Sequence, residues 1–161
     1  MNIVDLAKYI IEHYPHPKEL SKSRLNKIIY LVDWKFVLEF EKQLTNINWK
    51  FNHYGPYVDE IKDELQKDNR FVITSTTTMY GNPKDIIELA DNKNFVEPNS
   101  DEKEIIDFII DKTKRLYWNE FIELVYSTYP IISQEKGTNL DLVKLAKEYK
   151  EIIKSRNLTK R

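Results

Sequence analysis

Residues 21–57, SKSRLNKIIYLVDWKFVLEFEKQLTNINWKFNHYGPY, decide the fold of this 161-residue chain. Apolar residues in its first half recur three and four positions apart, a spacing that places them on one face of an α-helix. They are Leu25, Ile28, Ile29, Val32, Phe36 and Phe40. Leu31 and Trp34 extend the apolar surface, and Ser21 is suited to cap the helix by accepting a backbone hydrogen bond. We therefore predict a central helix covered on two sides.

The second half of the stretch is aromatic and ends in a glycine and a proline. Side chains over residues 49–53 alternate as they do in an extended chain, which predicts a short strand. Gly55 permits a turn with a positive φ, and Pro56 suits the first position of a following helix. We expect that helix to end near residue 67.

The next segment predicts a β-hairpin. Residues 71–80 are rich in β-branched and aromatic types, and a second apolar run follows at 86–90. Gly81, Asn82 and Pro83 lie between the two runs and are typical of a turn. We expect the hairpin to pack beside the strand at 49–53, and residues 91–99 to form a polar linker.

The rest of the chain reads as helices. They are predicted over residues 2–14, from residue 100, over 117–126 and over 140–153, with Asn2, Ser100 and Asn139 as caps. The fold class is α+β and helix-rich, with about six helices around a small antiparallel sheet of about three strands. We expect one domain over residues 1–161, in which 150–161 form a mobile basic tail.

Composition excludes several classes of protein. The chain carries 25 basic and 26 acidic residues, so its net charge of −1 gives no general attraction to nucleic acid or anionic lipid. It has no cysteine and no apolar run long enough for a membrane span. We expect a soluble, cytoplasmic protein. The basic residues after position 149 are typical of a frayed terminus, or of a contact for an acidic partner and, as a weaker alternative, for nucleic acid.

Sequence motifs for catalysis, metals and cofactors are lacking. The three histidines do not form a metal-binding pattern, and three glycines are too few for a phosphate-binding loop. Paired carboxylates such as Asp59 and Asp63 are explained by a solvated helix face. We expect no enzyme activity, no metal and no cofactor, although an unfamiliar active site would leave no motif.

Two segments resemble a known family. The run LNKIIYLVDW at 25–34, followed by FNHYGP at 51–56, is similar to the paired signature of the Panacea domain, the SocA-like antitoxin domain also found in phage-associated proteins. The run LVYSTYP at 124–130 resembles the family's C-terminal segment. This chain departs from the pattern in two places: Tyr57 replaces the usual valine, and Glu41 and Lys42 stand where many relatives carry a glycine.

The resemblance implies an antitoxin that neutralises a cognate protein toxin by direct binding, with the toxin encoded by the adjacent gene. An alternative is a proteolytic adaptor, or a phage or mobile-element regulatory scaffold without catalysis. The sequence is also compatible with a homo-oligomer.

The signature supplies the candidate partner-binding residues, which are Lys27, Tyr30, Tyr54, Gly55, Pro56 and Tyr57. Lys27 and Tyr30 share a helix face, and the tyrosines near the turn are of the type enriched at binding hot spots. We expect Lys27 to reach solvent or a carboxylate, because burying an unpaired lysine is costly. The alternative is that these residues maintain the fold and that the partner binds elsewhere.

Overall fold

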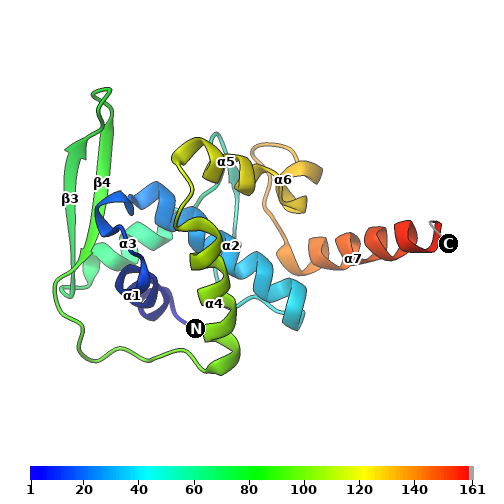
Figure 1. Ribbon diagram of the computed structural model, residues 1–161, viewed down its shortest axis with the longest axis horizontal. Helices are drawn as coiled ribbons and strands as arrows, with labels where there is room; N and C mark the ends of the chain where they lie inside the picture. Colours follow the sequence, from blue (N-terminus) through cyan, green and yellow to red (C-terminus); the bar gives the residue numbers. More distant parts are fainter. Residues whose placement is uncertain (160–161) are drawn as a thin grey trace.

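Helix α2, Lys22–Phe40, lies at the centre of the molecule (Figure 1). The computed structural model describes residues 1–159. Ser21 caps α2 as predicted, because its Oγ accepts from the Arg24 backbone N–H at 3.1 Å. Helices α1, α4 and α7 and strand β4 all contact α2. The prediction of a central helix covered on more than one side is therefore confirmed.

The fold class is α+β and helix-rich, as predicted. Residues 1–159 hold seven α-helices rather than about six, because the short α6 follows α5 directly. The helices are α1 Ile3–His13, α2, α3 Glu60–Lys67, α4 Ser100–Thr113, α5 Trp118–Tyr126, α6 Tyr129–Ser133 and α7 Leu142–Thr159, with a 3₁₀ turn at Pro17–Glu19. The strands are β1 Phe51–Asn52, β2 Gly55–Pro56, β3 Phe71–Thr77 and β4 Pro83–Leu89.

Strands β3 and β4 form the predicted hairpin, which projects from the helical body (Figure 1). The pairing is antiparallel and runs from Phe71 opposite Leu89 to Thr77 opposite Pro83. The prediction of a three-stranded sheet is wrong, because the described residues form two separate two-stranded sheets, β1–β2 and β3–β4.

Backbone pairing elsewhere explains why the segment at 49–53 does not join the hairpin. The Leu140 N–H donates to the Trp49 carbonyl at 2.8 Å, and the Phe51 N–H donates to the Thr138 carbonyl at 2.9 Å. β1 itself pairs with β2 across a tight turn. The backbone groups that a third strand would need are therefore already bonded.

Helices α1 and α5 begin one residue later than predicted, and the start or the cap differs further at α3, α4 and α7. Helix α3 begins at Glu60, and Pro56 lies in β2 rather than at the start of that helix. Asn99, not Ser100, caps α4 and forms a capping box with Glu102.

Helix α7 begins at Leu142, so the predicted start at residue 140 and the predicted Asn139 cap are wrong. The Asp141 side chain accepts from the Lys144 backbone N–H at 3.1 Å. The helix continues to Thr159, so most of the basic segment predicted as a tail is helical and extends away from the body (Figure 1). Residues 160 and 161 of that segment lie outside the described residues.

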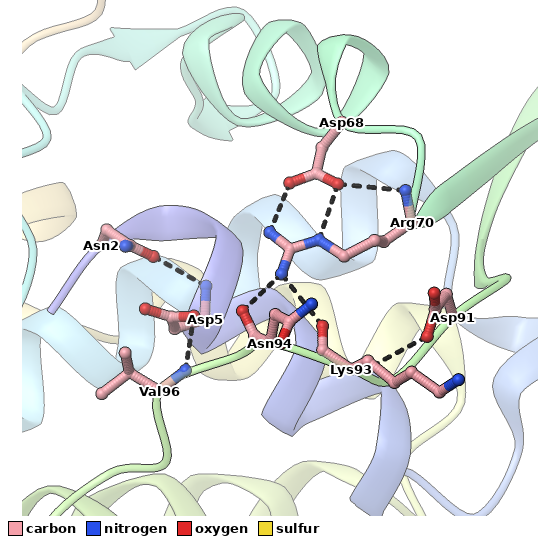
Figure 2. A network of polar contacts seen from close by, with 8 residues as sticks. All are labelled: Asn2, Asp5, Asp68, Arg70, Asp91, Lys93, Asn94 and Val96. Atoms are coloured by element: carbon pink, nitrogen blue, oxygen red, sulfur yellow. Dashed lines mark hydrogen bonds and ion pairs between the residues drawn. The ribbon is translucent and has the colours of Figure 1, made fainter.

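Several side chains attach the polar linker after β4 to the body: Glu97 of the linker pairs with Lys8 of α1, and Figure 2 shows the contacts of Arg70 and Asp5. The Arg70 guanidinium pairs with both carboxylate oxygens of Asp68 and donates to the backbone carbonyls at 93–94 at 3.2 and 2.6 Å. Asp5 of α1 accepts from the Val96 N–H at 3.0 Å. These bonds hold the linker against α1 and the α3–β3 junction.

Candidate functional site

The three signature segments, far apart in the sequence, meet at one place. The Tyr30 hydroxyl of α2 lies 2.8 Å from Thr128 Oγ1, just before α6. The Tyr126 ring packs edge-on against Phe51 of β1, with ring centroids 6.3 Å apart. The first half of α2, the β1–β2 turn and the α5–α6 junction therefore form one cluster.

Gly55 is required by the geometry of this cluster. Its φ is +103°, which confirms the predicted positive value and lies in a region that side chains rarely adopt. A Cβ at this position would lie 3.4 Å from Tyr126 Cε2 and 3.7 Å from Lys27 Cε. Pro56 is buried beside it and is paired with Phe51. The turn therefore packs directly over the lysine.

Tyr30 and Tyr54 lie in opposite environments. Tyr30 is fully buried and packs edge-on against Trp49, with centroids 5.5 Å apart. Burial raises its pKa. Tyr54, at the turn, is 82% exposed, and Tyr57 is half-buried. In this conformation Tyr54 and Tyr57 can touch another protein directly, whereas Tyr30 supports the core.

Lys27 does not reach solvent or a carboxylate, and that prediction is wrong. The residue is 1% exposed, and no acidic side chain of residues 1–159 forms an ion pair with it. Its Nζ donates to Ser23 Oγ at 3.4 Å and lies 5.8 Å from the centre of the Tyr57 ring. Desolvation lowers the pKa of Lys27 to about 8.

Two further lysines, Lys22 and Lys62, pair with Asp85, and Lys22 also faces the Tyr57 ring. Lys22 Nζ lies 5.8 Å from the same ring and 3.8 Å from Asp85 Oδ2. Lys62 Nζ of α3 lies 3.2 Å from the same Asp85 oxygen. The bond from Ser75 and the Lys62 ammonium lower the pKa of the Asp85 carboxyl. Lys22 and Lys62 thus share one aspartate, whereas Lys27 pairs with no described carboxylate.

Sequence reasoning brought Lys27 and Tyr57 together correctly but missed several neighbours of the site. Tyr126 and Thr128 belong to the segment at 124–130, whose resemblance to the family's C-terminal motif was the available signal. Lys22, Lys62 and Asp85 come from separate elements and carry no local sequence signal.

Other kinds of site find no support among the described residues. Within residues 1–159 there is no group of three His, Asp or Glu side chains arranged to hold a metal ion. Over the same range, no helix has both the length and the apolar character that a bilayer span requires.

Comparison with known proteins identifies the family. The family model described as "Antitoxin SocA-like, Panacea domain" matches residues 25–130, which is well over half of the chain and includes all three segments of the cluster. Neither the comparison with curated proteins nor that with solved structures gave a significant match. The chain therefore belongs to the SocA-like antitoxin family that is defined by the Panacea domain.

Proposed function

We propose that this chain is the antitoxin of a toxin–antitoxin pair and that it neutralises a cognate protein toxin by binding it directly in the cytoplasm. Membership of the antitoxin family, through a match that spans residues 25–130, is the observation that carries the proposal. Neutralisation by binding requires no catalytic step, no metal and no cofactor.

The turn surface is the region that we propose for toxin contact. It consists of Tyr54, Tyr57, Lys22 and Lys62, which lie on the β1–β2 turn, the segment that follows it, and the starts of α2 and α3. Aromatic side chains are enriched at binding hot spots, and Tyr54 is largely exposed. The backbone pairing of β1 with β2 holds the turn that carries these aromatics, which would reduce the loss of conformational entropy on binding.

Co-expression with the protein encoded by the adjacent reading frame tests the proposal. We expect growth to be rescued while the toxin stays at its normal level, and the two proteins to copurify. Loss of the toxin that depends on a cellular protease would instead support the proteolytic adaptor. Absence of both rescue and copurification would refute an antitoxin role toward that neighbour.

A double variant tests the place of contact. We expect Lys27→Ala with Tyr57→Ala to weaken neutralisation while the purified protein remains folded in a thermal melt. Full rescue by a normally folded double variant would show that the signature maintains the fold and that the toxin binds elsewhere.

A further inference from the structure

Lys27 differs from the other buried charged groups of the described chain in how it is satisfied. The Arg24 guanidinium donates to the Tyr14 hydroxyl at 2.7 Å and to the carbonyls of Thr113 and Leu116 at 2.8 Å. Asp33 accepts hydrogen bonds from the Thr45 backbone and hydroxyl, from Trp49 and from Gln43, and Lys8 pairs with Glu12 and Glu97. For Lys27, by contrast, the described residues supply one hydroxyl at 3.4 Å and one aromatic ring.

This arrangement is unfavourable for the isolated chain. An ammonium has three donors, and burying it without acceptors costs free energy that a methionine of similar length would not cost. Desolvation accordingly lowers the pKa of Lys27. Folding alone therefore does not explain a lysine at this position, whereas a missing anion would.

Tyr57 is the half-buried side chain in contact with this ammonium. Its ring faces Lys22 and Lys27 at 5.8 Å each, and no described residue forms a hydrogen bond with its hydroxyl. Rotation of the ring away from Lys27 would therefore break no hydrogen bond. The backbone of Tyr57 is held independently, because its N–H donates to the Lys50 carbonyl at 3.1 Å.

We propose that Lys27 receives a carboxylate from the protein partner: an aspartate or glutamate side chain of the toxin enters beside Tyr57 and forms an ion pair with the Lys27 ammonium. The inference rests on the proposed function, since it names the chemistry by which the turn surface recognises the toxin. Lys22 and Lys62 share Asp85, and Lys27 has no carboxylate partner among the described residues, so an incoming negative charge is favoured. The Lys27 ammonium is one buried charge that becomes accessible when the Tyr57 ring rotates. Such a site suits one carboxylate side chain, whereas a nucleic acid binds extended basic surfaces.

Binding to the protein encoded by the adjacent reading frame, measured by calorimetry, tests the pair. We expect Lys27→Met to bind at least about thirty-fold more weakly, because the toxin carboxylate would be buried without a partner. Lys35→Met is the matched control. Lys35 lies on the same helix and near the Phe108 ring, but it has its own carboxylate, Glu39, at 2.9 Å. We expect this variant to bind within about twofold of the native chain.

Two further measurements complete the test: the affinities of toxin variants, and the pKa of Lys27 in the native chain. Among Asp→Asn and Glu→Gln variants of the toxin, we expect one that weakens binding to the native chain but has no further effect on Lys27→Met. In the native chain, nuclear magnetic resonance of the lysine ammonium groups should show the pKa of Lys27 rising on complex formation.

The outcomes separate the two proposals. If the native chain does not bind the neighbouring protein, both the proposed function and this inference fall. If the native chain binds, the inference alone is overturned by either of two results: equal affinity for Lys27→Met, or an unchanged Lys27 pKa in the complex. The second result needs no variant, so misfolding of Lys27→Met would not protect the inference.

Discussion

Replacing Lys27 by methionine should stabilise the isolated protein at neutral pH. Methionine has a similar length and occupies the same buried site without a charge. Lowering the pKa of Lys27 from 10.5 to about 8 corresponds to about 3 kcal/mol of unfavourable free energy for the charged form in the folded state. Methionine loses the long bond to Ser23, worth about 0.5 kcal/mol. We therefore expect Lys27→Met to raise the free energy of unfolding by about 1–3 kcal/mol at pH 7.

The same lysine makes stability depend on pH in a defined direction. Below pH 8 it is protonated in both states, so the full penalty is present. Between pH 8 and about 10, the unfolded chain binds the proton more tightly than the folded protein, so stability rises with pH. Burial raises the pKa of Tyr9 and Tyr30, so the unfolded tyrosines ionise first and stability falls at higher pH. The stability of the native protein should therefore reach its maximum between about pH 9 and 10, and the rise should be absent from Lys27→Met.

Urea denaturation followed by circular dichroism at pH 7, 8, 9 and 9.5 measures both effects. Lys35→Met is again the control, because its charge is partly exposed and paired within the chain, and it should change stability by less than about 0.5 kcal/mol. A Lys27→Met protein less stable than the native one at pH 7 would refute the reasoning. So would a native stability that stays flat or falls between pH 8 and 9.5.

Three other variants test the cluster and the linker. Gly55→Val should lower the free energy of unfolding by at least about 1 kcal/mol through backbone strain and contact with its neighbours. Gly81 has a φ of +80° and nothing within 4 Å of an added Cβ, so Gly81→Val measures the strain alone. An equal loss of stability in both variants would show that contact with neighbours contributes nothing at Gly55. Tyr30→Phe should cost about 1 kcal/mol in the same denaturation assay, since it removes a buried hydrogen bond, and an unchanged midpoint would contradict this. Arg70→Ala should speed amide hydrogen exchange over residues 91–97, and native-like protection there would show that other contacts hold the linker.

The candidate site shows how far sequence reasoning reaches. The positive φ of Gly55 and the meeting of Lys27 with Tyr57 beside the turn followed from residue types and helical spacing. The burial of Lys27 and Tyr30 did not, because the segment at 124–130 that packs against this cluster lies about a hundred residues away. A lysine's partners are set by which elements fold over it, and no local pattern records them.

The sequence by itself determined the local structure of this protein. The spacing of apolar residues specified α2, Asn2 and Ser21 were recognisable as caps, and the β-branched run around Gly81 specified the hairpin. These features depend on neighbours within one or two turns of chain, which the sequence displays directly.

Tertiary structure alone decided the rest. The backbone at 49–51 pairs with 138–140 rather than with the hairpin, the polar linker is held by Lys8, Arg70 and Asp5, and Lys27 is enclosed without an anion. Each outcome is a competition between segments distant in the chain for the same hydrogen bonds or the same buried volume. Such a competition is resolved only when all of the elements pack together.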